Sequence, residues 1–505
     1  MEEKRQFVIC PYCCHKFAPG EADFRLNEAC AAMRDEVKTS LSKSQAQSLV
    51  KQVNQSKRKK AAQAQKDPDY GKAVDEKLYA YYREILKNSE EDARQKALQY
   101  AAVQADGENA GYSEADVENA GFPQKITYTD AAGKKHFSER RLCPNCHNVL
   151  PIGYGLRETI LISILGDARA GKSIYLTTLI HELENNVDFA SKLSFIGDAQ
   201  VKKEFYDHYQ KPLLEESVLI HSTERKKIPP FAYNYWYQYK DESGVMKENT
   251  IDIIFYDIAG EDLRDDVHMR QNGFNIKDSS GLIFLLDPTS FKKMEDLFLL
   301  KDKSILEMSS RGNSNKDIFS AMFNYFLGMD REKSSIPFAM TVSKSDLFHY
   351  VELSYFNNKP ESRVQNLLQN EVYRGYVPAG SVKGLNSEVN ELLRVLEMEP
   401  VLNQALGCFK NVSCFSVSSL GKQPRIERAS SEEGEVIEKG YLSGKLDPFR
   451  VKEPFYWILM KNKLLYKYEN NAYRMDGETS RENSRSAAKT SWVSRVFARM
   501  KKIFK

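Results

Sequence analysis

The feature that most constrains the fold is a glycine-rich segment between two apolar stretches. The apolar run Ile160–Leu165 leads directly into Gly166-Asp-Ala-Arg-Ala-Gly-Lys-Ser173, which has the spacing GxxxxGKS. A stretch with the character of a helix begins at Ile174. A strand, a glycine-rich turn and a helix in this order form a phosphate-binding loop. We therefore predict a site for a nucleoside triphosphate, in preference to an ordinary strand-to-helix turn.

The spacing of this loop assigns a role to each part of it. Gly166 and Gly171 permit backbone conformations in which successive amides converge on phosphate oxygens. Lys172 is expected to reach the β- and γ-phosphates, and the Ser173 hydroxyl to ligate Mg²⁺. The residues predicted to contact the nucleotide are Gly166, Asp167, Ala168, Arg169, Ala170, Gly171, Lys172, Ser173 and Ile174.

Short apolar runs alternate with longer helical stretches from residue 158 onward. The runs are Ile160–Leu165, Ile251–Tyr256, Leu282–Leu286, Phe338–Val342 and Val412–Val417. This alternation is typical of the α/β class, in which helices cover both faces of a mostly parallel sheet. We predict one such domain over residues 158–468, with insertions.

A second nucleotide-binding motif follows the run Ile251–Tyr256. Asp257 stands at the predicted strand end beside the phosphate-binding loop, where a carboxylate holds Mg²⁺, usually through a water. Gly260, three residues later, leaves its amide free to bind the γ-phosphate and to report its presence. The next apolar run also ends in an aspartate, Asp287.

The segment Ser343-Lys-Ser-Asp346 follows Phe338–Val342 and looks like the guanine-reading motif [NT]KxD, with Ser343 in place of Asn or Thr. Asp346 would accept hydrogen bonds from the guanine N1–H and N2 amine, a donor pair that adenine lacks. The Lys344 stem would lie over the base. A P-loop ATPase remains the alternative if this segment is a chance loop.

The last apolar run leads into Ser418 and Ser419. These residues resemble the SA[KL] loop whose backbone contacts guanine O6. The order of the motifs along the chain favours GTP over ATP.

With these motifs in this order, the chain resembles GTPases of the translation-factor-related (TRAFAC) class. Within that class it is most similar to the bacterial proteins called double-GTPase type 2, which carry an N-terminal zinc ribbon. The resemblance covers roughly residues 143–465. It implies a Mg²⁺-dependent switch that hydrolyses GTP to GDP and phosphate, and a protein effector that is itself a second GTPase.

The central catalytic residues follow from these motifs. Lys172, Asp257 and the Gly260 amide would position the nucleotide and stabilise charge, with no covalent step. Glu261 occupies the place where Ras-like GTPases keep a glutamine that positions water. Because a carboxylate there would repel the γ-phosphate, we expect slow hydrolysis without a partner.

Two further catalytic roles have candidates in polar loops. Thr223 is the candidate for the switch I threonine that meets Mg²⁺ and the γ-phosphate. Arg169, inside the phosphate-binding loop, is the candidate arginine finger, and Arg225 is a second. A solvent-facing loop residue is the competing interpretation of Arg169.

Two cysteine pairs with the same spacing stand far apart in the chain: Cys10-Pro-Tyr-Cys13 and Cys143-Pro-Asn-Cys146. Thiolates at positions i and i+3 converge on one ion, and two such turns form the ligand set of a structural zinc ribbon. A redox role would need a thioredoxin-like βαβ context, which this sequence lacks. Alternative ligands next to these pairs are Cys14, His15 and His147.

These features divide the chain into six predicted parts. They are the first half of the zinc ribbon (1–23), a polar helical insertion (24–122), the second half of the ribbon (123–157), the GTPase domain (158–468), a disordered linker (469–490) and a basic amphipathic helix (491–505). The helix would bind a membrane surface or a partner protein, or pack on its own domain.

Composition narrows the function further. The 73 basic and 70 acidic residues leave a net charge of +3, which argues against a globally basic nucleic-acid binder. We interpret the cluster Lys57–Lys60 as a solvated helix face, with a local nucleic-acid or membrane contact as the alternative. No apolar run reaches the ~18 residues of a membrane span. We expect a cytoplasmic protein, peripheral to the inner membrane face if the terminal helix binds lipid.

Two classes of function fit these observations. One is a GTP-hydrolysing switch that acts on a protein partner. The other is a nucleotide-gated zinc-ribbon adaptor with little turnover. Glu261 favours the adaptor, whereas the intact phosphate-binding loop with Asp257 favours the enzyme.

Overall fold

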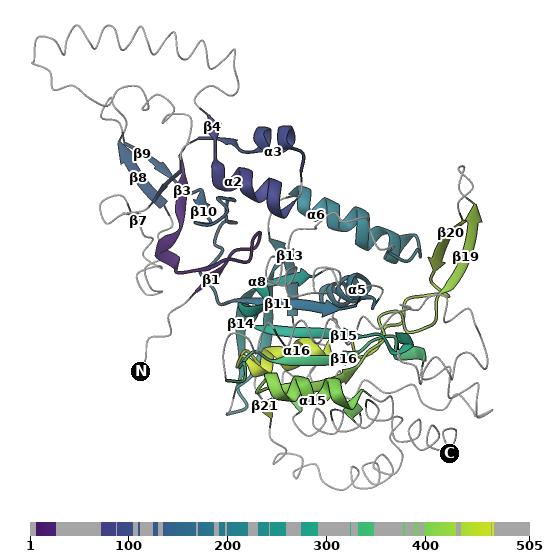
Figure 1. Ribbon diagram of the computed structural model, residues 1–505. Coiled ribbons are helices and arrows are strands. Elements are labelled where there is room, and N and C mark those ends of the chain that lie inside the picture. The colour runs from purple at the N-terminus through teal and green to yellow at the C-terminus, as the bar shows by residue number, and fades with distance from the viewer. Residues whose placement is uncertain are drawn as a thin grey trace, which may run out of the picture. The chain divides into compact units, whose positions relative to one another are not determined.

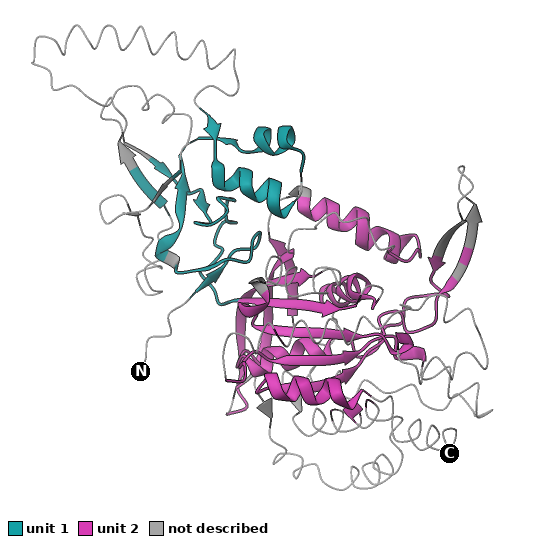
Figure 2. Cartoon of the chain, in the orientation of Figure 1, with its two compact units in different colours: residues 1–159, 225–230 teal, residues 160–224, 231–505 magenta. Residues whose placement is uncertain are grey.

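The structure is a computed structural model in which residues 7–26, 72–86, 88–100, 102–104, 110–111, 125–129, 135–167, 170–185, 191–196, 199–220, 231–241, 243–258, 274–290, 324, 332–347, 377–378, 386, 389–390, 393, 398–430, 436–465 and 467–468 are described. Figure 1 draws the other segments as a thin grey trace. The chain divides into two compact units, residues 1–159 with 225–230 and residues 160–224 with 231–505 (Figure 2).

A seven-stranded sheet forms the core of the second unit. Its strand order is β12-β13-β14-β11-β15-β16-β18, and Figure 1 shows β11, β15 and β16 side by side. Neighbours from β11 to β18 on one side pair in parallel, whereas β12, β13 and β14 pair antiparallel. The strands span Thr159–Gly166 (β11), Ser191–Ile196 (β12), Phe231–Lys240 (β13), Met246–Asp257 (β14), Gly281–Leu286 (β15), Phe338–Val342 (β16) and Val412–Ser416 (β18).

The five apolar runs all form strands of this sheet, which confirms that part of the prediction. The sheet is mixed: β11, β15, β16 and β18 pair in parallel, as predicted, whereas β12, β13 and β14 pair antiparallel. A tight turn joins β13 to β14: the Asp241 carboxylate accepts hydrogen bonds from the amides of Ser243 (2.9 Å) and Val245 (3.0 Å). So short a connection between β13 and β14 requires the two strands to run antiparallel.

Both faces of the sheet are covered at its centre, because every residue of β11 and β15 is buried. Helix α16 packs closely on β15, where Gly281 lies so near Ile458 that an added Cβ would meet its Cγ2 at 2.4 Å. Phe455 of the same helix contacts the rings of Tyr235 and Phe255. The described helices of this unit are α5 (Lys172–Glu184), α6 (Ala199–Phe205), a π-helix (Tyr206–Glu215), α8 (Phe274–Lys277), a 3₁₀ turn (Pro288–Ser290), α15 (Glu399–Cys408) and α16 (Glu453–Lys461).

Two further strand pairings belong to the second unit. β19 (Arg425–Ser430) and β20 (Val436–Tyr441) form an antiparallel hairpin, and β17 (Val377–Pro378) pairs with β21 (Lys467–Tyr468) in parallel. The segment just after the π-helix Tyr206–Glu215 contacts this hairpin: the Leu219 amide donates a hydrogen bond to the Gly440 carbonyl at 2.8 Å.

The first unit consists of short strands and helices. An antiparallel hairpin, formed by β8 and β9, precedes the second cysteine pair. β10 and β6 flank β3, so a strand inside the predicted insertion, β6, shares one sheet with β10 from the predicted second half of the ribbon. The elements are β1 (Val8–Ile9), β2 (Lys16–Phe17), a 3₁₀ turn (Pro19–Glu21), β3 (Asp23–Arg25), β4 (Ala73–Val74), α2 (Glu76–Ala80), a π-helix (Tyr81–Ile85), α3 (Glu90–Lys96), β5 (Leu98–Gln99), β6 (Ala102–Gln104), β7 (Ala110–Gly111), β8 (Lys125–Thr129), β9 (Lys135–Ser138) and β10 (Arg141–Leu142).

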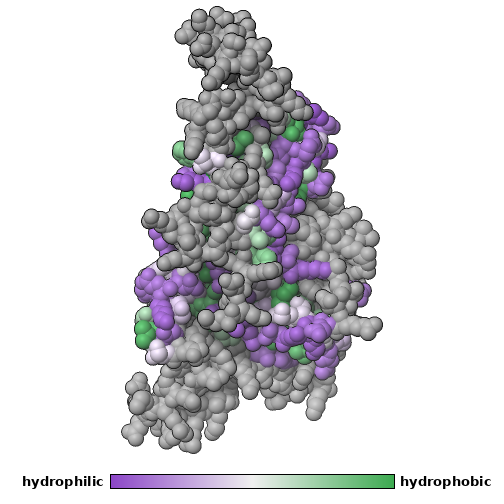
Figure 3. Space-filling view, turned by 90° about the vertical axis from the view of Figure 1, so that its left-hand side faces the viewer, coloured by the Kyte–Doolittle hydropathy of each residue, from purple (hydrophilic) through white to green (hydrophobic). Residues whose placement is uncertain are grey.

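The predicted insertion, residues 24–122, contains strands as well as helices where it is described. The predicted linker (469–490), the terminal helix (491–505) and the basic cluster Lys57–Lys60 lie outside the described residues. Among the described residues, every helix is too short or too polar to span a bilayer. Figure 3 shows one face, on which the coloured residues are mainly hydrophilic and the hydrophobic ones form small separate spots.

Candidate functional site

The phosphate-binding loop has the backbone that its glycines predict. Gly166 ends β11 with φ +146°, and a Cβ there would lie 2.6 Å from the Leu285 carbonyl oxygen. Gly171 has φ +86° and precedes the first residue of α5. Both positions therefore require glycine, one for close approach to β15 and both for a positive φ.

Lys172 is folded back over the loop. Its Nζ donates hydrogen bonds to the carbonyl oxygens of Gly166 (3.0 Å) and Asp167 (2.8 Å), and only 9% of the residue is exposed. The ammonium thus lies within the loop, beside the N-terminus of α5 and its partial positive charge. This arrangement places two sources of positive potential where an anion would approach.

Ser173 and Asp257 form the second part of this site. The Ser173 hydroxyl donates a 2.7 Å hydrogen bond to Asp257 Oδ2, while Oδ1 is buried without a hydrogen-bond partner among the described residues. Burial raises the pKa of Asp257, and the Lys172 charge and the Ser173 bond partly oppose that rise. A hydroxyl, a carboxylate and a buried oxygen that lacks a partner fit the oxygen-ligand preference of Mg²⁺.

The predicted guanine motif bridges two neighbouring strand ends. Both the amide and the hydroxyl of Ser343 donate to the Leu286 carbonyl at the end of β15, at 2.8 and 3.0 Å. The Ser345 amide donates to the Val417 carbonyl, directly after β18, at 3.0 Å. The serine at the first motif position therefore still anchors the motif to its neighbour.

The structure brings the two predicted guanine-contacting segments together. The Ser418 hydroxyl donates a 2.5 Å hydrogen bond to Asp346 Oδ1 and accepts one from the Gly421 amide at 2.9 Å. The adjacent Ser419 carbonyl accepts from Thr178 of α5 at 3.4 Å. The buried Ser418 hydroxyl thus orients the Asp346 carboxylate. The loop that contains Ser418 and Ser419 is in turn linked to α5, the helix that follows the phosphate-binding loop.

One contact at this edge was missed from the sequence. The Lys344 ammonium lies 2.6 Å from Asp287 Oδ2, and Lys344 has φ +50°. The only sequence signal was the position of Asp287 at the end of an apolar run. β11, β15, β16 and β18 are parallel, so their carboxyl ends share the edge at which these groups meet.

Several predicted site residues cannot be placed at this edge. The positions of Ala168, Arg169, Thr223, Gly260 and Glu261 lie outside the described residues, as does Arg225. Their assigned roles stay predictions.

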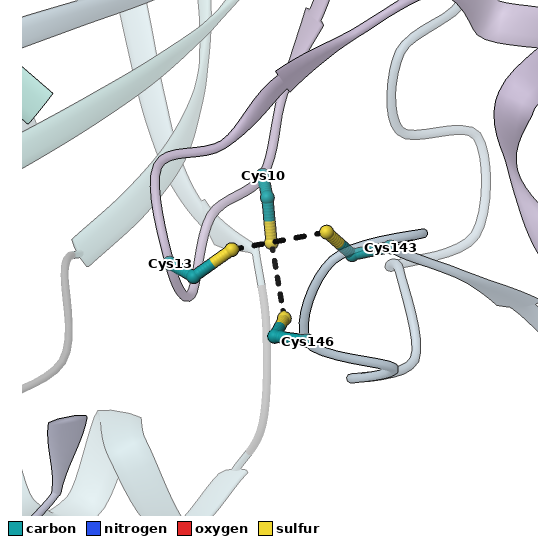
Figure 4. A group of neighbouring side chains, drawn as sticks. All are labelled: Cys10, Cys13, Cys143 and Cys146. Carbon is teal, nitrogen blue, oxygen red and sulfur yellow. Dashed lines mark hydrogen bonds between the residues drawn. The ribbon is translucent and has the colours of Figure 1, made fainter. Parts of the chain in front are cut away.

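The two cysteine pairs of the first unit meet in one buried cluster. Figure 4 shows the sulfurs of Cys10, Cys13, Cys143 and Cys146 pointing toward one another from two loops, and all four lie within 4.8 Å of each other. The Cys10–Cys146 and Cys13–Cys143 sulfur distances are 3.7 and 3.8 Å. A tetrahedral ion with metal–sulfur bonds of about 2.3 Å requires sulfur separations of about 3.8 Å. The cluster therefore fits Zn²⁺.

The two loops that hold the cluster have the same backbone design. In each, the amide of the first cysteine donates a hydrogen bond to the carbonyl five residues later: Cys10 N to His15 O, and Cys143 N to Asn148 O. The residue after each second cysteine is left-handed, with φ +55° at Cys14 and +53° at His147. This repetition explains why two distant CPxC segments present their sulfurs alike.

The alternative ligands lie outside the four-sulfur cluster. Both ring nitrogens of His147 bind carboxylates, Nδ1 that of Asp75 at 2.8 Å and Nε2 that of Asp23 at 2.9 Å. The Asp75 carboxylate also accepts a hydrogen bond from the buried Arg25 guanidinium at 2.6 Å. This charge network next to the cluster was not predicted, because its members come from three distant segments.

The thiol pKa values in the cluster indicate that four thiolates there would need a bound cation. Burial raises the pKa of the Cys10 and Cys146 thiols, whereas hydrogen bonds from the neighbouring thiols lower the pKa of Cys13. Four buried sulfurs cannot all carry negative charge unless a positive ion compensates it.

No family model matches the chain. It is 26% identical over 167 residues to the protein named "Putative ESX-1 scaffolding and assembly protein SaeC" of Mycolicibacterium smegmatis; the match covers 31% of this chain and 40% of that protein. The chain therefore spans about two fifths of that relative.

Solved structures with some similarity include the GTP-bound S. cerevisiae Ski7 GTPase-like domain, with 12% identity, 52% of this chain and 43% of that one covered, and a TM-score of 0.23. Another is the signal recognition particle receptor SRb-GTP/SRX complex from Chaetomium thermophilum, with 15% identity, 52% and 93% covered, and a TM-score of 0.21. These TM-scores are too low to support an argument about fold or function.

Proposed function

We propose that this chain binds GTP with Mg²⁺ at the carboxyl edge of its central sheet and hydrolyses it as a switch that acts on a protein partner. The observation that carries the proposal is the Ser173–Asp257 hydrogen bond beside the folded-back Lys172, within a loop of GxxxxGKS spacing. A lysine, a hydroxyl, a carboxylate and a helix N-terminus are the groups that phosphate and Mg²⁺ require.

On the phosphate side, Lys172 and the loop amides would neutralise the β- and γ-phosphates. Ser173 and Asp257 would hold Mg²⁺, which when bound neutralises charge that develops on the phosphate oxygens. The first turn of α5 fixes the Ser173 hydroxyl, and the end of β14 fixes the Asp257 carboxylate. Rigid placement of these groups lowers the cost of reorganisation during phosphoryl transfer.

On the base side, Asp346 would accept from the guanine N1–H and N2 amine. The 2.5 Å hydrogen bond from Ser418 supports this role, because it restricts rotation of the carboxylate. The Ser419 backbone would meet guanine O6, and the Lys344 stem would cover one face of the base. If these groups do not recognise guanine, the alternative is a P-loop ATPase.

Hydrolysis would need the groups outside the described residues. We assign water positioning to Glu261, γ-phosphate sensing to the Gly260 amide, Mg²⁺ contact to Thr223 and charge stabilisation to Arg169. Because Glu261 would repel the γ-phosphate, turnover would be slow until a partner binds. The same glutamate supports a second candidate function, that of a nucleotide-gated adaptor with little turnover.

The remaining proposals concern the metal and the partners. The four-cysteine cluster would bind a structural Zn²⁺, with no open position for chemistry. The resemblance to double-GTPase proteins suggests a second GTPase as partner in the cytoplasm of a bacterium. The segment 491–505 would bind that partner or the inner membrane face.

Binding of fluorescent GTP, GDP and ATP analogues in the presence of Mg²⁺ tests the guanine assignment. Wild type is expected to bind both guanine nucleotides and to ignore ATP, and Asp346→Ala to lose guanine binding. Equal affinity for ATP that is unaffected by the substitution would contradict guanine recognition and leave a P-loop ATPase. Phosphate release from bound GTP then separates the enzyme from the adaptor.

A further inference from the structure

Asp287 is a buried acidic residue at the end of β15, with 0% of its surface exposed. Its Oδ2 accepts a hydrogen bond from the Lys344 ammonium at 2.6 Å. We propose that Asp287 is a positioning residue for the base: it holds the Lys344 side chain in the orientation that forms one wall of the guanine pocket. This step rests on the proposed function.

The two oxygens of Asp287 have separate partners. Oδ1 accepts from the Thr289 amide at 2.9 Å and from the Thr289 hydroxyl at 2.6 Å. Oδ2 accepts from Lys344 of the neighbouring motif. The first oxygen therefore anchors the carboxylate to its own turn, so that the second is held in one direction before any ligand binds. A preorganised acceptor loses little entropy when it orients a flexible lysine.

The backbone around Lys344 also directs the side chain toward β15. Lys344 has φ +50°, a conformation that a residue with a side chain rarely adopts. The amides on both sides hold it there: Ser343 N donates to Leu286 at 2.8 Å, and Ser345 N to Val417 at 3.0 Å. With 29% of the Lys344 side chain exposed, its stem lies at the surface while its charge meets a buried carboxylate.

This arrangement separates two tasks of the base site. A stem that lies on a base plane contacts a π-face, which every base has, so its contribution is tolerant of base identity. Asp346, oriented by Ser418, contacts polar groups at the base edge, and these differ between guanine and hypoxanthine. Asp287 should therefore affect affinity without affecting discrimination between these two bases.

The test uses the full chain with Mg²⁺ and measures GDP and IDP affinity by calorimetry. Asp287→Asn keeps an oxygen for Thr289 and replaces the acceptor for Lys344 with an amide donor. We expect it to lower the affinity for both GDP and IDP roughly tenfold and to leave the ratio of the two affinities unchanged. In the Lys344→Ala background, the same substitution should have no further effect.

Ser418→Ala is the matched control at the other side of the base. It removes the Ser418 hydrogen bond to Asp346, the proposed partner of the N2 amine that hypoxanthine lacks, so it should change the GDP to IDP ratio. Thermal unfolding without nucleotide should be alike for wild type and Asp287→Asn, because the turn bonded through Thr289 is kept.

Three outcomes would overturn the inference. They are an unchanged GDP affinity in Asp287→Asn, a loss that adds fully to that of Lys344→Ala, or a changed GDP to IDP ratio in Asp287→Asn. Each would reduce the Asp287–Lys344 pair to a structural ion pair. A wild-type chain that binds no guanine nucleotide would instead contradict the proposed function itself.

Discussion

Ser173 and Asp257 are separated by 84 residues, yet the Ser173 hydroxyl donates a 2.7 Å hydrogen bond to the Asp257 carboxylate. The bond joins the first turn of α5 to the end of β14. It places a hydroxyl and a carboxylate at one point beside the phosphate-binding loop. This pairing makes the proposed Mg²⁺ site testable without knowledge of any partner.

Asp257→Asn is expected to weaken GTP binding at least roughly tenfold when Mg²⁺ is present and to have little effect in EDTA. The amide is neutral and would lose most of the attraction to the ion. A Mg²⁺ titration of nucleotide affinity measures this. Thr177→Ser, one turn further along α5 with its hydroxyl bonded to the Ser173 carbonyl, is the control and should match wild type. An unaltered Mg²⁺ dependence in Asp257→Asn would argue against this ligand.

Cys13→Ala is expected to abolish the bound zinc, whereas Cys14→Ala should retain one equivalent. The two cysteines are neighbours, but the four-sulfur cluster contains Cys13 and not Cys14. Removal of one of four thiolates leaves an incomplete tetrahedral site. Elemental analysis of the purified variants gives the zinc content. Zinc retained in Cys13→Ala and lost in Cys14→Ala would reverse the assignment.

Asp75→Ala is expected to destabilise the first unit by about 3–5 kcal/mol, because it leaves the buried Arg25 guanidinium without its carboxylate. The pair is separated by 2.6 Å, with side chains 1% and 9% exposed. Hydrogen exchange of α2 amides reports the loss of stability. Lys96→Ala removes the exposed ion pair with Asp92 and should cost at most about 1 kcal/mol. Equal effects of both substitutions would show that burial does not strengthen the Arg25 pair.

Gly281→Ala and Gly407→Ala are expected to change stability in opposite directions. A Cβ at Gly281 would lie 2.4 Å from Ile458 Cγ2, so α16 would have to shift at a cost of about 1–3 kcal/mol. A Cβ at Gly407, within α15, would meet nothing within 4 Å. Alanine there should stabilise by about 0.5–1 kcal/mol, because it restricts the unfolded chain. Thermal unfolding of both variants checks the signs, and a stabilised Gly281→Ala would refute the close packing.

The elements that could be predicted are those whose signal is local. Each of the five apolar runs forms a strand because it is uniformly apolar over the length of one. β12 was missed, since Ser191–Ile196 mixes polar and apolar residues at the edge of the sheet. The antiparallel pairing of β13 and β14 depends on a turn at Asp241, and a periodicity of apolar residues does not reveal the side-chain hydrogen bonds of that turn.

The GxxxxGKS loop and the repeated cysteine turns could be predicted from residue order alone, because glycine spacing and CPxC spacing impose a local backbone. The fold was needed to show that Cys13 and not Cys14 joins the cluster, that Ser418 orients Asp346, and that Lys344 meets Asp287. These contacts depend on the order of strands in the sheet and on the meeting of distant loops. Such long-range pairings leave no fixed spacing in the chain, so no local pattern could reveal them.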